Sequence, residues 1–213
     1  MNNKKSALVL GATGLVGCAL VNELCWDERY EKVVCLIRSP LVASRYFDPT
    51  GKIEPLVINF ENLQDYQGYF SVDHVYCCLG TTIKQAGSKS AFRKVDFQLI
   101  HVAAQLSRAQ RVKSFVWISS VGANAKSRHF YLRVKGELEN AILSMPQLNN
   151  PSAVRPPLLH DDRTSIGQIN RPLERFASYV LVAISPLLIG RLKKYRPVRA
   201  IQVAREMVRL QVF

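Results

Sequence analysis

Six short runs of apolar residues alternate along the chain with segments whose residues favour helices. The apolar runs cover residues 7–10, 33–37, 56–60, 72–80, 114–120 and 152–155. The predicted helices lie between them, after residue 15 and over residues 62–69, 90–109 and 131–143. Continuous apolar runs of this length are typical of strands that are buried on both faces. The alternation predicts an α/β fold with a parallel, doubly wound sheet and helices on both of its faces.

The pattern loosens after the sixth apolar run. The stretches Pro172–Ile184 and Pro197–Leu210 read as two helices that flank a basic loop. A chain of this length suits one domain with a sizeable core. We therefore predict a single domain over residues 1–213, with the sheet in residues 1–160 and a small helical cap in residues 161–213.

The first apolar run leads into three glycines at G-x-x-G-x-x-G spacing, and then into a predicted helix. In such a unit one glycine permits the turn, one lets the backbone approach a pyrophosphate, and one lets helix and strand pack closely. The helix N-terminus adds free N–H groups and the positive end of a dipole. The spacing differs from the usual G-x-G-x-x-G fingerprint. We expect a dinucleotide to contact Gly11, Thr13, Gly14, Leu15, Val16 and Gly17, which makes residues 1–160 the nucleotide-binding core.

The second apolar run ends at Arg38 and Ser39, and no carboxylate lies between Lys32 and Phe47. Enzymes that select NAD usually place an acidic residue near this strand end, where it binds the ribose 2′-hydroxyl. A guanidinium instead suits a 2′-phosphate, although Arg38 has an alternative interpretation as a solvated residue at a strand end. Because a glycine loop lies upstream, the sequence favours NADP(H) as the cofactor, held by Arg38 and Ser39.

Tyr131 and Lys135 are one helical turn apart, so both lie on one face of the predicted helix 131–143. A neighbouring lysine favours the phenolate of a tyrosine and lowers a pKa that starts near ~10. Such a phenol exchanges a proton with a carbonyl or alcohol oxygen during hydride transfer. Ser119 or Ser120 can hydrogen-bond the same oxygen. Tyr-x-x-x-Lys is also common as a surface pair, but its place after a strand that ends in Ser-Ser favours catalysis.

These motifs, in this order, resemble those of the short-chain dehydrogenases/reductases, and especially an atypical subgroup that includes the Tat-interacting oxidoreductase and its bacterial relatives. The resemblance rests on residues 11–17, Cys77–Thr82, Ser119-Ser120, Tyr131–Glu137 and Arg155-Pro156. It implies a Rossmann-type fold, NADPH as the nucleotide and Tyr131 as proton donor or acceptor. We also expect cofactor contacts at Asn59, Leu79, Gly80, Thr81, Lys135, Arg155 and Pro156.

The chain departs from this family at two positions. Members often carry Asp after the third strand, where it meets the adenine amino group, whereas this chain has Asn59. Many relatives carry Asn on the helix before the serine strand, where it supports a proton relay, whereas this chain has Asp96. The first change leaves an acceptor without charge, and the second puts the relay in doubt.

The net charge of +13 is concentrated near the end of the chain, where residues 163–213 hold ten Lys and Arg against two Asp and Glu. A basic patch can bind nucleic acid, an anionic membrane surface or a phosphate-rich ligand. No nucleic-acid motif accompanies it, so no specific nucleic-acid partner is expected. No apolar run reaches the ~18 residues of a membrane span.

Five cysteines form no C-x-x-C pair and no zinc spacing, so no metal site is expected. The odd number and the mostly apolar contexts fit a reducing compartment, which predicts a cytoplasmic protein. The pair Cys77-Cys78 has an alternative interpretation as a redox device. Lys4 and Lys5 before an apolar run also allow a secretory signal, but the three glycines that follow and the lack of a cleavage site argue against it.

The sequence therefore favours an NADPH-dependent oxidoreductase that acts on an unidentified small carbonyl or alcohol. A sugar-nucleotide epimerase uses the same groups and stays open. So does a non-catalytic NADP(H)-binding protein that reports redox state through a partner, although such a sensor has no need of the Tyr-x-x-x-Lys pair. A polyanion binder that uses the basic C-terminal quarter rests on charge alone. Homo-oligomerisation is left open.

Overall fold

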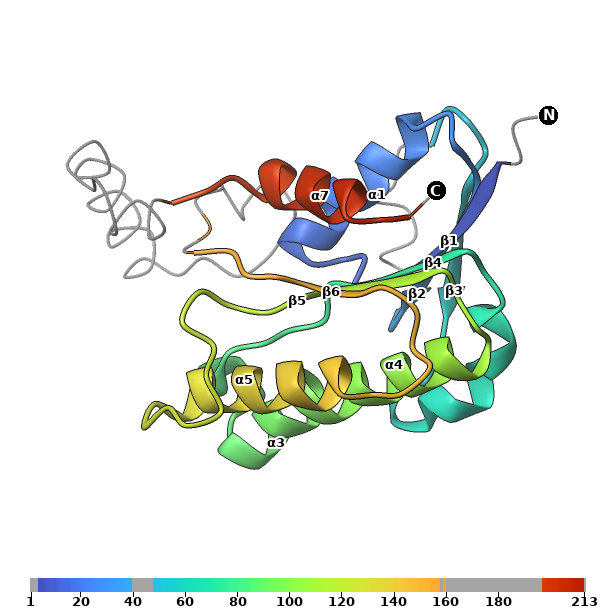
Figure 1. The fold of residues 1–213 in the computed structure, drawn as a ribbon. Coiled ribbons are helices and arrows are strands. Elements are labelled where there is room, and N and C mark those ends of the chain that lie inside the picture. The colour runs from blue at the N-terminus through green and yellow to red at the C-terminus, as the bar shows by residue number, and fades with distance from the viewer. Residues whose placement is uncertain (1–3, 40–47, 158, 160–196, 213) are drawn as a thin grey trace.

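The computed structural model describes residues 4–39, 48–157, 159 and 197–212, and its centre is a six-stranded parallel sheet (Figure 1). The strand order is β3-β2-β1-β4-β5-β6. The strands are β1 Lys5–Leu10, β2 Tyr30–Ile37, β3 Ile53–Val57, β4 His74–Cys77, β5 Ser114–Ile118 and β6 Pro151–Val154. The predicted parallel, doubly wound sheet is confirmed, and the strand order reverses between β1 and β4.

Helices cover both faces of the sheet. Helices α1 and α7 lie on one face, and α3, α4 and α5 lie on the other (Figure 1). Their bounds are α1 Leu15–Trp26, α2 Ile83–Ala86, α3 Lys89–Arg93, α4 Ile100–Ala109, α5 Phe130–Leu143 and α7 Ala200–Arg209. Neighbouring residues of one strand enter different cores: Val9 packs with α1, whereas Leu8 packs with α4 and α5. Burial on both faces explains why the strands read as continuous apolar runs.

The third strand begins and ends three residues before the predicted run 56–60. Strand β3 pairs with β2 in the register that joins Val33 to Ile53 and Ile37 to Val57, so both strands end together. Ile58 and Phe60 are buried, but they belong to the turn into a 3₁₀ helix, η2 Phe60–Phe70. The predicted run 56–60 therefore corresponds to the core residues of this turn. Strand β3 itself has a weak apolar signal, because it is an edge strand whose Glu54 and Pro55 are exposed.

The predicted helix 90–109 is divided into three parts. A π-helical segment, η3 Lys94–Leu99, connects α3 to α4. Asp96 lies within this segment and is 1% exposed. A π-helical turn changes the direction of the side chains it carries, and such turns are frequent at functional sites.

The predicted helix 197–210 is present as α7, which lies beside α1 on the same face of the sheet (Figure 1). Arg205 of α7 pairs with Glu23 of α1 at 3.1 Å. Helix α7 therefore forms one layer with α1, the helix that follows the glycine loop. The other predicted C-terminal helix, 172–184, lies outside the described residues, and the division into core and cap stays a prediction.

Candidate cofactor and active site

The loops that follow β1, β4 and β5 lie at one edge of the sheet, because these neighbouring strands are parallel. In open parallel sheets, ligands bind outside the carboxyl ends of the strands at the point where the order reverses. That point is the junction of β1 and β4. The glycine loop follows β1, the residues after Cys77 follow β4, and the serines after Ile118 follow the neighbouring strand β5. All three segments therefore lie at this edge of the sheet.

Two of the three loop glycines are required by the packing of the chain itself. Gly11 has φ +75°, and a Cβ there would lie 2.6 Å from the carbonyl carbon of Cys78. A Cβ on Gly17 would overlap the carbonyl oxygen of Gly11. These glycines therefore let the loop pass between β4 and α1, as expected for close helix–strand packing.

Gly14 is different, because the described part of the chain does not need a glycine there. Its φ is −76°, and a Cβ would meet only the Gly11 carbonyl oxygen, at 3.4 Å. It is the N-cap of α1, without a side-chain cap and without an acidic residue in the first helical turn. The first amides of a helix have no partner within the helix. A small N-cap beside unused amides fits a pyrophosphate.

Arg38 and Ser39 follow β2 at the same edge of the sheet. Arg38 is exposed, and no ion pair or hydrogen bond of its side chain is found within residues 4–39, 48–157 and 197–212. Such a guanidinium is available for a phosphate. Asn59 lies one strand further out, where its side-chain oxygen accepts from Glu61 N at 3.0 Å and caps η2. Its expected contact with adenine stays a prediction.

The residues after β4 join the glycine loop to the Tyr–Lys helix. Leu79 N would be 2.7 Å from a Cβ on Gly11. A Cβ on Gly80 would be 3.5 Å from Asp96 Oδ1 and 4.0 Å from Lys135 Nζ. Thr81 N donates to Asp96 Oδ2 at 2.8 Å. The segment 79–81 therefore spans the distance from the nucleotide loop to Lys135.

Helix α5 carries both members of the Tyr–Lys pair, in different surroundings. Tyr131 is half-buried, and its ring packs against Phe92 with 5.7 Å between ring centroids. Lys135 is 3% exposed, and its Nζ lies 2.8 Å from Asp96 Oδ1. Nζ also donates to the carbonyl oxygen of Ile118 at 3.4 Å. The ionic partner of Lys135 is thus Asp96, which the sequence had identified only as a departure from the family pattern.

The two serines after β5 also differ. Ser119 is 2% exposed, and its Oγ has no hydrogen-bond partner among the residues that the structure describes. Ser120 is half-buried and donates to the Val121 carbonyl oxygen at 3.2 Å. Lys135 binds the carbonyl of the residue before Ser119, so Ser119 is adjacent to the ion pair. The free hydroxyl makes Ser119 the stronger candidate for a ligand contact.

Arg155 and Pro156 are held by groups that the sequence did not reveal. The guanidinium of Arg155 donates to both carboxylate oxygens of Glu139, at 2.8 Å and 2.6 Å. Pro156 accepts from Val121 N at 3.2 Å, which joins the loops after β5 and β6. Glu139 lies one turn beyond Lys135 and is 4% exposed. The sequence signal that could have predicted this pair was Glu139, a carboxylate among the apolar residues on the buried face of α5.

Gly136 was quoted in the motif but given no role, and the structure shows one. A Cβ at this position would overlap the backbone of Asn124 and Ala125. Asn124 N also donates to the Leu132 carbonyl oxygen at 3.0 Å. The glycine therefore lets the loop between β5 and α5 lie directly on the helix that carries Tyr131. A lone glycine inside a helical pattern is the signal for such a close approach.

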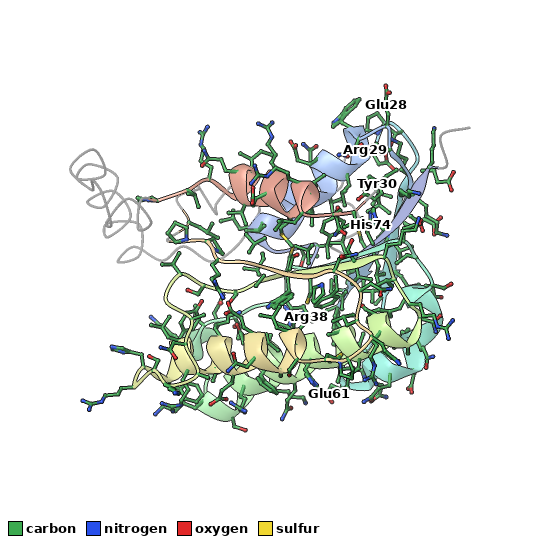
Figure 2. The ribbon with its side chains drawn as sticks, viewed as in Figure 1. Glu28, Arg29, Tyr30, Arg38, Glu61 and His74 are labelled. Carbon is green, nitrogen blue, oxygen red and sulfur yellow. The ribbon has the colours of Figure 1, made fainter. Side chains whose placement is uncertain are left out.

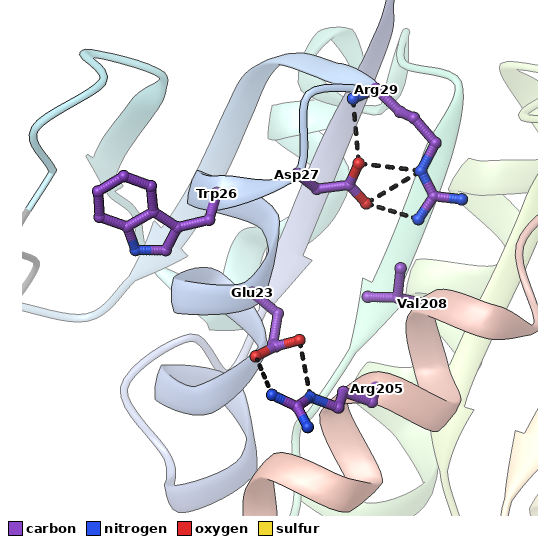
Figure 3. A pocket seen from close by; sticks show the side chains of 6 residues that line it. All are labelled: Glu23, Trp26, Asp27, Arg29, Arg205 and Val208. Atoms are coloured by element: carbon purple, nitrogen blue, oxygen red, sulfur yellow. Dashed lines mark hydrogen bonds and ion pairs between the residues drawn. The ribbon is translucent and has the colours of Figure 1, made fainter.

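A separate pocket of about 290 Å³ is lined by residues from the C-terminal end of α1, the turn after it and α7 (Figure 3). Its charged side chains are paired: Arg29 with Asp27 at 2.6 Å, and Arg205 with Glu23 at 3.1 Å. It lies far along α1 from Gly14. We therefore place the candidate site at the glycine loop and not in this pocket.

The model of the NAD(P)H-binding family matches residues 11–180, which include the glycine loop and the helix with Tyr131. The chain belongs to the NAD(P)H-binding family. "Protein FMP52-1, mitochondrial" of Scheffersomyces stipitis is 37% identical over 171 residues, which are 78% of this chain and 72% of the relative. "Protein HTATIP2" of Rattus norvegicus is 34% identical over 174 residues, 81% of this chain and 69% of that protein. The expected family resemblance is confirmed.

Solved structures share the fold of this NAD(P)H-binding family member. A Burkholderia thailandensis oxidoreductase of the short-chain dehydrogenase/reductase family superposes with a TM-score of 0.70 at 19% identity, covering 98% of this chain and 85% of its own. Other structures with the fold are longer, and the chain spans about half to two thirds of their length. No helix within the described residues is long and apolar enough to cross a membrane. Since several yeast relatives are named mitochondrial, a cytoplasmic location stays a prediction.

Proposed function

We propose that this protein is an NADP(H)-dependent oxidoreductase of the short-chain type that acts on a small carbonyl or alcohol. One observation carries the proposal: residues 79–80 pass close to both parts of the site, since a Cβ on Gly11 would lie 2.7 Å from Leu79 N and a Cβ on Gly80 would lie 4.0 Å from Lys135 Nζ. A dinucleotide whose pyrophosphate lies at Gly14 would therefore extend along residues 79–81 toward the Tyr–Lys helix. Arg38 favours NADPH over NADH, because a guanidinium can donate two parallel hydrogen bonds to a 2′-phosphate.

In this mechanism the α1 amides would hold the pyrophosphate and Arg38 would hold the 2′-phosphate. The nicotinamide would supply or accept the hydride when bound. Tyr131 Oη gives its proton to the substrate oxygen during reduction and takes it back during oxidation. Ser119, with Ser120 as the alternative, donates a hydrogen bond to the same oxygen. Lys135, whose Nζ lies 2.8 Å from Asp96 Oδ1, is proposed to bind the ribose hydroxyls.

A second candidate, a non-catalytic NADP(H)-binding regulator, is favoured by one observation. Lys135 and Arg155, both expected to serve the cofactor, already have carboxylate partners, at 2.8 Å and 2.6 Å. A protein that only binds the nucleotide needs no free lysine beside its tyrosine. Turnover separates these two candidates.

The test compares NADPH consumption by the wild type and by Tyr131→Phe with a panel of aldehydes, ketones and sugar nucleotides. The variant keeps the ring that packs on Phe92 and removes only the hydroxyl. We expect turnover to fall by the ~10²- to 10⁴-fold typical of a lost general acid–base, with NADPH affinity nearly unchanged. Tyr69→Phe, at a 44% exposed tyrosine, is the matched control. Full turnover in Tyr131→Phe would remove the assignment, and wild-type binding without turnover would favour the regulator.

A further inference from the structure

The two chain segments that follow β4 and β5 carry positive charges and no exposed negative ones. Residues 80–95 contain four Lys or Arg and no Asp or Glu, and residues 119–136 contain another four and no Asp or Glu. Strands β4 and β5 are parallel neighbours, so both segments begin at the carboxyl edge of the sheet, where the candidate site lies. The edge of the molecule beside Tyr131 is therefore basic.

A direct contact shows that these two segments meet. Lys89 Nζ, at the start of α3, lies 5.5 Å from the ring centroid of Phe130, the first residue of α5. Helices α3 and α5 lie side by side (Figure 1), and the Phe92 ring packs against both Phe130 and Tyr131, with 5.8 Å and 5.7 Å between centroids. A ring attracts an ammonium group but does not neutralise it. Lys89 therefore brings a full positive charge to the residue that precedes Tyr131.

Only half of these cations have a carboxylate partner. The paired ones are Arg93, Lys94, Arg133 and Lys135. The others are exposed, and they have no carboxylate partner among the residues that the structure describes: Lys84, Lys89, Lys126 and Arg128. Like charges repel each other, so gathering them does not stabilise the fold. A negatively charged ligand would supply the missing counter-charge.

The phosphates of the proposed cofactor are expected elsewhere. The pyrophosphate is expected at Gly14 and the 2′-phosphate at Arg38, which follows β2 on the other side of β1 from β4. Along the segment after β4, the chain passes the glycine loop and then Lys135 before it reaches Lys84 and Lys89. These unpaired cations therefore lie past the nicotinamide end of the proposed cofactor, where a substrate would bind.

We propose that the substrate carries an anionic group, a phosphate or a carboxylate, and that Lys89 binds this group together with Lys126 and Arg128 of the loop before α5. The proposal rests on the proposed function and names the substrate class of the same site. Lysine and arginine donate charge-assisted hydrogen bonds to anionic oxygens. Unpaired cations around a site also raise the local concentration of anions. The carbonyl or alcohol of the same molecule then faces Tyr131.

The first test needs no turnover. The full chain labelled with ¹⁵N is titrated with inorganic phosphate at low ionic strength, and its backbone amide shifts are followed by NMR. We expect saturable shifts in residues 84–89 and 126–131, separate from any shifts at the glycine loop. In Lys89→Gln with Lys126→Gln, the dissociation constant from these residues should rise about tenfold or more, because charge-assisted hydrogen bonds are lost.

Arg108→Gln with Arg111→Gln makes the same change of charge at the end of α4 and is the matched control. It should keep the wild-type dissociation constant. Absence of shifts in residues 84–89 and 126–131, or an equal rise of the dissociation constant in both double variants, would overturn the proposal.

The second test compares aldehydes that differ only in the anionic group. Glyceraldehyde 3-phosphate is paired with glyceraldehyde, and succinic semialdehyde with its methyl ester, each with NADPH. We expect a higher kcat/KM for the anionic member of a pair, and Lys89→Gln with Lys126→Gln should reduce that preference about tenfold through KM. A preference for the neutral aldehydes would overturn the proposal and leave the oxidoreductase function intact. Phosphate binding at these residues without turnover of any compound would contradict the proposed function and leave the anion site in place.

Discussion

Two buried polar clusters lie at opposite edges of the same sheet, and they are built differently. At the carboxyl edge, Asp96 and Lys135 are charged, and Ser119 Oγ has no partner among the described residues. At the amino edge, the buried rings of Tyr30 and His74 lie close together (Figure 2). Tyr30 Oη is 2.7 Å from His74 Nδ1 and 2.8 Å from Tyr76 Oη. The first cluster faces the loops of the site, and the second is closed by the end of the chain.

The protons of the amino-edge cluster follow from its partners. His74 Nε2 is 2.9 Å from the Val212 carbonyl oxygen, which can only accept, so Nε2 carries the hydrogen. Nδ1 of the neutral ring then accepts from Tyr30 Oη, which in turn accepts from Tyr76 Oη. The hydrogen bonds are therefore donated in one direction, from Tyr76 to Tyr30, from Tyr30 to His74, and from His74 to the backbone that follows α7.

The comparison separates two uses of buried polarity. A neutral cluster of linked rings attaches the C-terminal residues to β2 and β4 and contributes to stability, with one buried polar atom beside it, Gln211 Nε2, left without a partner among the described residues. A charged cluster beside an unpartnered hydroxyl leaves groups for a ligand, which is typical of functional sites. Variants at the carboxyl edge should change ligand binding, and variants at the amino edge should change stability.

The largest expected effect is at the glycine loop. Gly14→Val places a branched side chain beside the first amides of α1, where the pyrophosphate is expected. Since the fold itself leaves room at Gly14, we expect only a small fall in the unfolding temperature, because valine is a poorer N-cap than glycine, and NADPH binding weakened by roughly a hundredfold, ~2.7 kcal/mol. Calorimetry and thermal unfolding measure the two quantities.

Two glycines make this experiment specific. Gly68→Val makes the same change on η2, where a Cβ meets nothing within 4 Å, and should leave NADPH affinity unchanged. Gly17→Val meets the Gly11 carbonyl and should prevent folding. Wild-type NADPH affinity in Gly14→Val would mean that the spacing of the glycines serves packing alone.

A smaller effect is expected at Arg38. The wild type should bind NADPH about tenfold or more tightly than NADH, because the 2′-phosphate gains a charge-assisted contact. Arg38→Ala should remove most of that difference by weakening NADPH, with little change for NADH. Calorimetry with both nucleotides measures it, and Arg108→Ala on α4 is the control. Equal affinities in the wild type would contradict the assignment of Arg38.

The smallest effect is a pH dependence of stability at the amino edge. Burial lowers the pKa of His74, so the unfolded chain binds this proton more tightly than the folded chain. The contribution of neutral His74 is therefore present above the ordinary pKa near 6.5 and is lost as the pH falls below it. One such group changes the free energy of unfolding by at most about 1.4 kcal/mol per pH unit.

We expect the wild-type unfolding temperature to fall by a few degrees from about pH 7.5 to about pH 5.5. His74→Gln should be less stable at neutral pH and should show a flatter slope, with NADPH affinity unchanged. His129→Gln, at an exposed histidine, should keep the wild-type slope. A loss of NADPH affinity in His74→Gln would mean that the two edges are coupled, and the comparison would fail.

The sheet could be predicted because its inner strands are buried on both faces and therefore stand out as apolar runs. The prediction erred at β3, where one edge is exposed and the strongest apolar residues, Ile58 and Phe60, belong to the following turn. The π-helical segment was not predictable either. Its local sequence favours an ordinary helix, and the partners of Asp96 within it, Lys135 and Thr81, lie on other elements.

The candidate site was predictable where it depends on spacing within one segment. The glycine loop and the Tyr131–Lys135 pair are of this kind, and their locations follow from the fold. The partners of Lys135 and Arg155 are not, because Asp96 and Glu139 meet them across elements that are distant in sequence. A buried carboxylate on the inner face of a helix indicates that a cation lies opposite, but it does not say which one.

The two outermost strands each contain a proline, Pro55 in β3 and Pro151 in β6. Proline has no N–H, and on an edge strand it interrupts the row of donors that another strand would use. Each border of this sheet therefore lacks one of the donors that a strand from a second molecule would use. Among the described residues, both borders of the sheet are therefore poorer templates for strand addition than an edge with a full row of donors, which disfavours growth of copies into a continuous cross-β stack.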